Sequence, residues 1–380
     1  MKKTSIYFLL VFVVLTACSS QEISIGVLHE HANKERVSKD TSVKRFNREI
    51  SIAAIGDILI HDRVYLDAWD GELYDFQPMF ASIKDYLINT DITLANQESI
   101  MGGEAIGLSN YPQFNSPFEI GDTLQDVGVD IVTMANNHTL DRGEQAIRNA
   151  VNYYNEIGMA YTGSFISEED NETIRVLDVK GITVAFLSYT YGTNGMPVPD
   201  RKDYLVNLID KQAIENDVKK ANNLADMTIV SYHFGDEYQR LPNQEQQDLA
   251  QFAADLGVEV VIGHHPHVLQ PVDWVEGKDG NQTLVAYSLG NFLSGQYELY
   301  QRIGGIFQFS AKKDGTTITV DTPVFLPTFV DFDIINDKMT DVQVIPLKDV
   351  SDEQLSNASD HLEEIKAHLT KYVDDVQFID

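Results

Sequence analysis

The residues best suited to chemistry are His264, His265 and His267, three histidines within four positions that follow the apolar run 258–262. That run is rich in β-branched residues, which is typical of a buried strand. Open α/β sheets bind ligands beyond the carboxyl ends of their strands, where these imidazoles would fall. On an extended segment the rings of His265 and His267 would point to the same side. Two such imidazoles suit a transition metal, although a solvated His-rich loop would give the same pattern.

Polar side chains of ligand type also follow four other apolar runs in the sequence. A single Asp or His at a strand end is more often a turn residue than a ligand, but five such ends in order favour a site. If the strands lie side by side, these ends form one cluster. Carboxylates, amides and imidazoles together suit Mn, Zn, Fe or Mg. The residues concerned are Asp57, Asn96, Glu98, Asn137, His138, His233, His265 and His267.

The elements that must position these residues alternate between β and α patterns along the chain. This alternation predicts an α/β fold with largely parallel pairing at its centre. An Asp-Gly turn at 314–315 predicts a hairpin within 303–326, so we expect mixed sheets. The last predicted helix covers 353–372, with Ser351 as a possible N-cap. Other helices are expected at 142–157, 211–224 and 244–256, and strands at 49–55, 92–95, 129–135, 182–189, 227–232 and 283–288.

Length and charge restrict the possible functions. The chain has 380 residues, enough for one large domain or two ordinary ones. It carries 28 basic and 58 acidic residues, a formal net charge of -30. Because contact with phosphates needs a basic face, we expect no nucleic-acid partner. A polyanion would need a locally basic or metal-loaded groove.

The N-terminal segment has the features of a bacterial lipoprotein signal. Two lysines precede an apolar stretch at 6–15, and Leu15-Thr16-Ala17-Cys18 resembles a lipobox. We therefore expect a signal peptide over 1–17, lipidation of Cys18, and a polar tether over 18–47. An uncleaved anchor helix or an ordinary secretory signal are the alternatives. Lipidation would attach the protein to the cell membrane on its extracytoplasmic face.

In their order along the chain, these motifs resemble those of the calcineurin-like metallophosphoesterase superfamily, and more closely those of the CapA/PgsA family. CapA/PgsA proteins are membrane-attached components of poly-γ-glutamate capsule synthesis. The resemblance covers about residues 50–310. The segments that carry it are Gly56-Asp57-Ile58-Leu59, Asn96-x-Glu98, Ala135-Asn136-Asn137-His138-x-x-Asp141-x-Gly143, His233-x-Gly235-x-Glu237, Gly263-His264-His265-Pro266-His267-Val268-Leu269-Gln270 and Tyr287-Ser288-Leu289-Gly290-Asn291-Phe292.

The resemblance implies a fold, a site and partners. The fold would be an αββα four-layer sandwich with mixed sheets, metallophosphoesterase-like over 48–326 and followed by a C-terminal extension over 327–380. His138 would give a proton to a leaving oxygen, and one or two divalent metals (Mn, Zn, Fe or Mg) would be bound. The partners would be poly-γ-glutamate or a similar anionic polymer and membrane-bound synthase components. The implied metal ligands are Asp57, Glu98, Asn137, His233, His265 and His267.

The chain departs from the superfamily pattern at two motifs. The first lacks its Asp-x-His, because Ile58 and Leu59 follow Asp57 and the next histidine is His61. The second has Glu98 where the superfamily has an aspartate. These changes could leave one strong metal position rather than two.

Three further residues are candidates for the site, and three functions stay open. Glu237 could act as a catalytic base or orienting group, and Arg142 and Asn96 could contact an anionic substrate. The first function is an accessory role in synthesis or export of a capsule polymer. The second is metal-dependent hydrolysis of phosphate esters or of the polymer amide. The third is a binding module that kept the fold and lost the chemistry.

Overall fold

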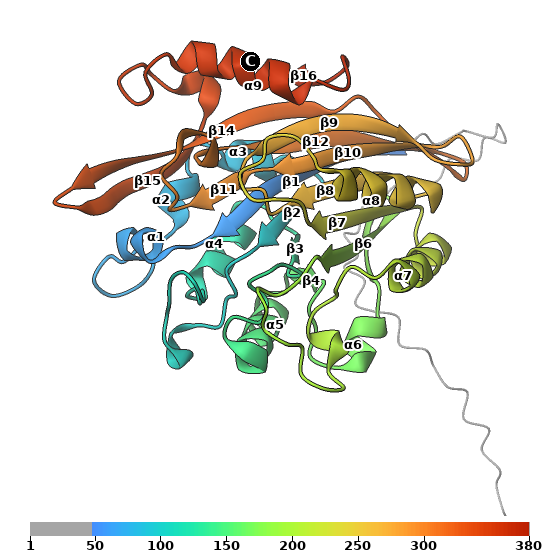
Figure 1. Ribbon diagram of the computed structural model, residues 1–380, viewed down its shortest axis with the longest axis horizontal. Coiled ribbons are helices and arrows are strands. Elements are labelled where there is room, and N and C mark those ends of the chain that lie inside the picture. Colours follow the sequence, from blue (N-terminus) through green and yellow to red (C-terminus); the bar gives the residue numbers. More distant parts are fainter. Residues whose placement is uncertain (1–47, 380) are drawn as a thin grey trace, which may run out of the picture.

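In the computed structural model, which describes residues 48–379, two mixed β-sheets pack face to face (Figure 1). The larger sheet consists of β1 (Arg48–Leu59), β2 (Ile92–Gln97), β3 (Ile131–Thr133), β4 (Ala160–Thr162), β11 (Asn291–Ser294), β12 (Ile303–Asp314), β13 (Thr317–Val320), β14 (Val324–Ile335), β15 (Lys338–Pro346) and β16 (Gln377–Phe378). Its main order is β15-β14-β12-β1-β2-β3-β4. Along this order the neighbours from β1 to β4 are parallel, and the pairs β1-β12, β12-β14 and β14-β15 are antiparallel.

The smaller sheet has a parallel centre and antiparallel edges. Its strands are β5 (Arg175–Val179), β6 (Ile182–Thr190), β7 (Met227–His233), β8 (Val260–His264), β9 (Leu269–Glu276) and β10 (Gln282–Leu289). Their order is β5-β6-β7-β8-β10-β9. The four inner strands are parallel, whereas β5 and β9 are antiparallel to their neighbours. The predicted mixture of parallel and antiparallel pairing is confirmed.

Helices cover the outer faces of both sheets. The larger sheet is covered by α1 (Asp62–Asp67), α2 (Gln77–Phe80), α3 (Lys84–Ile88), α4 (Glu119–Asp126) and α5 (Gly143–Ile157). The smaller sheet is covered by α7 (Lys211–Leu224) and α8 (Gln244–Asp255). A short helix α6 (Glu168–Glu172) precedes β5, and 3-10 turns lie at Glu104–Ile106, Asp203–Leu205, Leu299–Gln301 and Leu347–Asp349.

Alternating side chains on each strand build separate hydrophobic cores. In β1, Ile52 packs against the other sheet, while its neighbour Ala53 packs against the helices on the outer side. In β7, Ile229 and Val230 divide in the same way between the inner core and the helices of the smaller sheet. One inner core and two outer cores give four layers, so the predicted αββα sandwich is confirmed.

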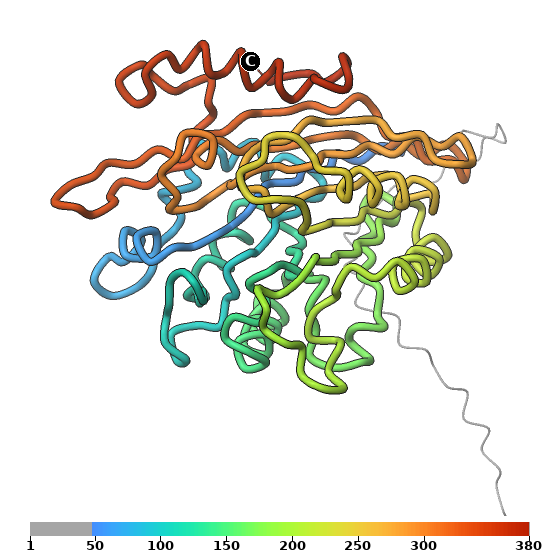
Figure 2. The backbone as a smooth tube through the Cα atoms, viewed as in Figure 1, coloured from blue at the N-terminus to red at the C-terminus, as the bar shows by residue number. Residues whose placement is uncertain are grey.

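The C-terminal residues pack on this sandwich. The boundary expected at 326–327 lies inside β14, and the hairpin of β14 and β15 extends to one end of the molecule (Figure 2). The last helix, α9 (Ala358–Leu369), adds Ile365 and Leu369 to the inner core.

The start of the last helix was predicted wrongly. We expected a helix from residue 353 with Ser351 as its N-cap, whereas α9 begins at Ala358 and has Asn357 at its N-cap position. Ser351 instead forms a separate turn, in which its hydroxyl donates to Gln354 Oε1 at 2.9 Å. The Asp352 carboxylate accepts a hydrogen bond from the Ala358 N–H at 3.2 Å. The backbone N–H at the start of α9 is thus satisfied by an acid six residues earlier in the chain.

An acidic residue directly precedes each of four parallel strands and hydrogen-bonds to the neighbouring strand. Each carboxylate accepts the backbone N–H of a residue on the neighbouring strand at 2.7 to 3.0 Å. These bonds add to the strand register at the end opposite the carboxyl ends. The pairs are Asp91 with Ser51, Asp130 with Thr93, Asp226 with Thr183, and Glu259 with Thr228.

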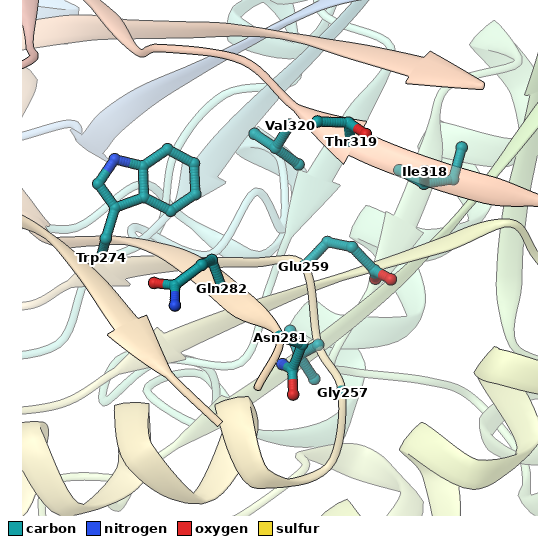
Figure 3. A pocket seen from close by; sticks show the side chains of 9 residues that line it. Gly257, Glu259, Trp274, Asn281, Gln282, Ile318, Thr319 and Val320 are labelled. Atoms are coloured by element: carbon teal, nitrogen blue, oxygen red, sulfur yellow. The ribbon is translucent and has the colours of Figure 1, made fainter. Parts of the chain in front are cut away.

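The fourth of these acids lines a pocket. Glu259 faces a hollow of about 250 Å³ together with Trp274 of β9 and Ile318 and Val320 of β13 (Figure 3). Burial raises the pKa of Glu259 to about 7, although its bond from Thr228 opposes the shift. Among the described residues, no candidate metal-binding group includes a residue of this pocket.

Replacing Glu259 with Gln is expected to stabilise the protein at pH 8 but not at pH 4. In the folded protein the carboxylate is disfavoured, so its destabilising effect appears as pH rises from the unfolded value of 4.5 towards about 7. The amide can still accept the Thr228 N–H without this charge. Urea unfolding should show a gain of about 2 kcal/mol at pH 8. The exposed Glu353→Gln serves as control, and an equal gain at both pH values would contradict the prediction.

Candidate metal centre

The ligand-type residues meet at one end of the sandwich, at the carboxyl ends of strands from both sheets. This end is opposite the acidic strand starts and the Glu259 pocket. Because β1, β2 and β3 belong to the larger sheet and β7 and β8 to the smaller one, the site lies across the inter-sheet seam. The buried members are Asp57 in β1, Glu98 after β2, Asn137 after β3, His233 at the end of β7, and His265 and His267 after β8.

Asp57 is the centre of one half of the site. Its Oδ2 atom lies 3.2 Å from His267 Nδ1, and its Oδ1 atom lies 3.2 Å from His264 Nδ1. Asn96 donates from Nδ2 to Asp57 Oδ1 at 2.8 Å. Burial opposes ionisation of this fully buried carboxyl, but the bonds and charges of His264 and His267 hold the pKa of Asp57 well below its usual value. Asp57 is therefore anionic, which suits a candidate metal ligand.

Glu98 and His233 form the other half. His233 Nε2 lies 2.9 Å from Asn137 Oδ1 and 3.5 Å from Glu98 Oε1. Glu98 Oε1 also lies 3.7 Å from His267 Nε2 and so faces both halves. The side chain of Glu98 is fully buried.

Three groups of side chains each place their ligand atoms within 4.8 Å of one another. Glu98 belongs to two of these groups, and His265 and His267 each belong to two. The arrangement therefore offers overlapping positions for a cation rather than one closed cage. The groups are Asp57 with Glu98 and His267, Glu98 with His233 and His265, and Glu237 with His265 and His267.

The histidine loop is a tight turn, so the expected extended segment is wrong. β8 ends at His264, and both His265 and His267 have left-handed backbone, with φ of 97° and 59°. Pro266 between them cannot donate to a strand ladder, and its carbonyl accepts from Tyr238 N at 2.8 Å. The two imidazoles still converge, with ring centroids 5.9 Å apart. Such strained conformations are typical of functional sites.

A glycine just before this loop lets the end of β8 approach the neighbouring strand. A Cβ on Gly263 would lie only 1.9 Å from the Tyr287 carbonyl oxygen of β10. Any larger residue would push β8 away from β10. The Gly-His pattern at 263–264 is thus explained by packing directly beneath the site.

The charge states of the histidines suit metal binding. Burial lowers the pKa of His233 well below its usual value and lowers that of His265 to about 3, so both rings are neutral at pH 7. Burial also opposes charge on His267, but Glu98 and Asp57 raise its pKa to about 9. Neutral imidazoles are the form that coordinates metals, whereas His267 would release its proton on binding one.

The buried polar atoms without partners indicate that a cation fits here. Both carboxylate oxygens of Glu98 and the Nδ1 atom of His265 have no hydrogen-bond partner although they are buried. Burial raises the pKa of Glu98 well above its usual value. A buried carboxyl without partners is unfavourable, and a bound divalent cation would compensate it. The residues present therefore fit a divalent metal, which would polarise a bound oxygen and lower the pKa of a bound water.

Some neighbours orient the ligands instead of binding a metal. Asn96 is fully buried, and it accepts from Thr133 Oγ1 at 3.1 Å while donating to Asp57. These bonds give Asn96 an orienting role, and its predicted contact with substrate stays a prediction. His264, which we had not included among the ligands, supports Asp57 from the other side. The three neighbouring histidines were visible in the sequence, but their spacing alone did not show which one supports Asp57 and which ones could bind a metal.

His138 is held beside the cluster by a carboxylate. Its Nδ1 atom lies 2.6 Å from Asp141 Oδ2, and its ring packs edge-on against Phe114 at 4.7 Å. Asp141 also accepts the Phe114 N–H at 2.7 Å, so one buried acid fixes both neighbours. A histidine oriented through Nδ1 can exchange a proton at Nε2. Sequence reasoning missed this role of Asp141, although an acid three residues after a histidine was a visible signal.

The remaining candidates lie around the cluster. Glu237 is exposed, but its carboxylate comes within 4.8 Å of the ligand atoms of His265 and His267. Arg142 donates to the carbonyls of Ile106 and Gly107 at 2.7 and 2.9 Å, so it anchors the loop between β2 and α4. Its predicted contact with an anionic substrate stays a prediction.

His61 follows β1 and packs against Phe114. Its Nδ1 atom is 3.1 Å from the Leu59 carbonyl oxygen, and its ring packs edge-on against Phe114 at 5.1 Å. None of the candidate metal groups in residues 48–379 includes it.

Comparison with known proteins identifies the family. The model of the family described as "Bacterial capsule synthesis protein PGA_cap" matches residues 51–296, more than half of the chain. The chain belongs to the PGA_cap family. The resemblance to CapA/PgsA proteins is thereby confirmed. All the candidate metal ligands of this PGA_cap protein lie within the matched residues, whereas β12 to β16 and α9 lie beyond them.

Two curated relatives are similar to this PGA_cap protein. The capsule biosynthesis protein CapA of Bacillus anthracis is 27% identical over 297 residues, which cover 74% of this chain and 68% of the relative. The PGA biosynthesis protein CapA of Bacillus subtilis (strain 168) is 31% identical over 203 residues, covering 53% of this chain and 52% of the relative. The match thus spans about half the length of the second relative.

Some solved structures are also similar to this chain. NAD nucleotidase (NadN) of Haemophilus influenzae matches with a TM-score of 0.44 and 13% identity, covering 88% of this chain and 64% of that one. The calcineurin-like phosphoesterase YfkN of Bacillus subtilis matches with a TM-score of 0.40 and 14% identity, covering 84% of this chain and 98% of that one.

Proposed function

We propose that this protein is a lipid-anchored, extracytoplasmic component of the synthesis or export of a poly-γ-glutamate-type capsule polymer, acting through a divalent metal site. The family and the names of both curated relatives support the capsule role. The observation that carries the metal site is the buried Glu98, whose oxygens lack partners among converging Asp and His ligands.

The proposed lipid anchor and synthase partners are inferred from the sequence. The signal peptide over 1–17, lipidated Cys18 and the tether over 18–47 lie outside the residues that the structure describes. Within residues 48–379, no helix combines the length and apolarity needed to cross a bilayer. We propose that Cys18 attaches the protein to the membrane beside the synthase components.

The metal would also explain how an acidic protein meets an acidic polymer. The chain has a net charge of -30, so its average field repels a polyanion. A bound divalent metal would be a local positive charge to which polymer carboxylates can coordinate. Mn, Zn, Fe and Mg all accept the ligand types present.

Complementation in the native host tests this proposal. A deletion strain would receive the parent gene, Asp57→Asn, or the control Asp62→Asn, whose carboxylate is outside the cluster. We expect the surface polymer to be lost or altered in length with the deletion and with Asp57→Asn, but not with Asp62→Asn. The proposal fails if the deletion leaves every surface polymer and its chain length unchanged.

A second function, metal-dependent hydrolysis, is favoured by the His138–Asp141 pair. Beside a metal-bound phosphate ester or polymer amide, His138 could protonate the leaving atom, and Asp141 would hold the ring in position. This arrangement is not needed for a site that only binds a polymer.

His138→Ala is expected to lower turnover about 100-fold or more without changing the bound metal, because it removes only the proton donor. Hydrolysis of aryl phosphates and γ-glutamyl oligomers would be measured on the metal-loaded protein, with metal content determined in parallel. His361→Ala, on the distant helix α9, is the matched control. Equal turnover in His138→Ala and the parent would exclude this role.

A further inference from the structure

Two half-exposed tyrosines lie over the histidines of the metal centre. The Tyr191 ring, directly after β6, lies 4.7 Å from the His265 ring and is 46% exposed. The Tyr238 ring, on the loop after β7, lies 6.1 Å from the His267 ring and is also 46% exposed. Each phenol thus covers one ligand and still meets solvent at the mouth of the site.

Both tyrosines are fixed by bonds to the ligand loops. Tyr191 N donates to the His233 carbonyl at 3.0 Å, and Tyr238 N donates to the Pro266 carbonyl at 2.8 Å. Gln296 donates from Nε2 to the Tyr238 hydroxyl at 3.4 Å, and the hydroxyl in turn donates to the carboxylate of Glu237, an oxyanion of the cluster. The backbone of each tyrosine is therefore held against a segment that carries candidate ligands.

A third neutral donor lies at the same rim. Asn194, on the loop after β6, is exposed, and its Nδ2 atom is 3.5 Å from His138 Nδ1. Its Oδ1 atom accepts from Asn137 at 3.4 Å. The loop that carries Tyr191 thus also reaches the proposed proton donor.

Three other arginines, Arg63, Arg142 and Arg240, already have partners in the folded chain. Arg63 lies 3.9 Å from the Asp62 carboxylate and stacks on the Tyr297 ring at 4.6 Å. Arg240 forms two bonds to Glu364 of α9, at 2.8 and 3.2 Å. As described above, Arg142 donates to loop carbonyls. Each of these guanidinium groups is therefore already engaged in the folded chain.

We propose that Tyr191 and Tyr238 donate hydrogen bonds to the oxyanion that the metal centre holds, either a phosphoryl group or a γ-glutamyl carboxylate. This inference rests on the proposed metal site. A phenol can bind an oxyanion without a charge of its own. An arginine at this rim would instead pair with Glu98 or Glu237 and compete with the metal for them. Neutral donors thus leave the carboxylate ligands available.

Titration calorimetry on the manganese-loaded protein tests this role. Inorganic phosphate and γ-glutamylglutamate would be titrated separately into the parent, Tyr191→Phe, Tyr238→Phe and the double variant. The control is Tyr297→Phe, whose ring faces Arg63. Each single variant should bind at least one of the two ligands about tenfold more weakly, with its metal content unchanged, since a hydrogen bond to a charged group is lost. An effect on phosphate alone indicates a phosphoryl substrate, and one on the dipeptide alone indicates a carboxylate.

The possible failures are distinguishable. Unchanged affinities for both ligands in the tyrosine variants, with metal bound, would overturn this inference and leave the metal site intact. The same holds if the metal-loaded parent binds neither ligand. If the parent takes up no metal from manganese or zinc, the proposed metal site fails and this inference fails with it.

Discussion

Asp57→Asn is expected to reduce the affinity for divalent metal by two to three orders of magnitude. Asp57 is fully buried and lies 3.2 Å from His264 on one side and from His267 on the other. An amide of the same size brings no negative charge, and its NH2 group would face an imidazole. A loss of about 3 to 4 kcal/mol in metal binding corresponds to this change in affinity. The side chain keeps its volume, so the strands around it should pack as before.

Elemental mass spectrometry of protein prepared without chelator checks this expectation. The purified chain from residue 19 onwards would be compared with Asp57→Asn and with Asp62→Asn, whose side chain lies outside the cluster and is 42% exposed. About two metals per chain in the parent would mean that two of the overlapping positions are used, and about one would mean a reduced site. Retention of parent-level metal in Asp57→Asn would contradict the assignment of Asp57 as a ligand.

The positions of the strand ends could be predicted from the sequence because each ligand follows an apolar run. Asp57 and His233 are the clearest cases, since a buried strand leads directly to each. The alternation of such runs with helical patterns predicted an α/β fold with parallel pairing at its centre, whereas the two packed sheets with helices outside were implied by the family resemblance. Hydrophobic burial determines these features, and it leaves a strong pattern in the sequence.

The directions of the side chains could not be predicted in the same way. His265 and His267 were expected on one face of an extended segment, but Pro266 and the packing against β10 force a turn with left-handed residues. The rings converge because of that turn. Which atom of His264 faces Asp57 likewise depends on a contact across the seam between the sheets. Spacing along one strand carries no information about such contacts.

The C-terminal residues show a second limit. The inner core receives Ile365 and Leu369 from α9, yet the periodicity of 353–372 did not reveal where the helix begins. Asp352 satisfies the start of α9 from a preceding turn, and such a turn competes with continued helix for the same polar groups. Local hydrogen bonds therefore decided the boundary, while burial decided that a helix exists.

Glu98→Gln is expected to have opposite consequences without and with metal. Without metal, both oxygens of this buried carboxyl lack hydrogen-bond partners, and burial raises its pKa well above its usual value. Removing the charge should therefore leave the free energy of unfolding unchanged or raise it by about 1 to 3 kcal/mol. The gain should increase as pH rises from the unfolded value of 4.5 towards the raised pKa, because over this range the carboxyl ionises in the unfolded chain while burial keeps it protonated in the folded one.

With metal, the same substitution should lower stability relative to the parent. A ligand at about 1,000 times its dissociation constant stabilises the folded state by about 4 kcal/mol, and most of this depends on the ligands that bind it. Thermal unfolding of the parent and of Glu98→Gln, in chelator and in excess manganese or zinc, measures the change in stability under both conditions. The exposed Glu353→Gln serves as control. If Glu98→Gln were less stable than the parent in chelator, Glu98 would have a structural role of its own. Only a site built to receive a cation makes the effect of this carboxylate change sign when the cation is added.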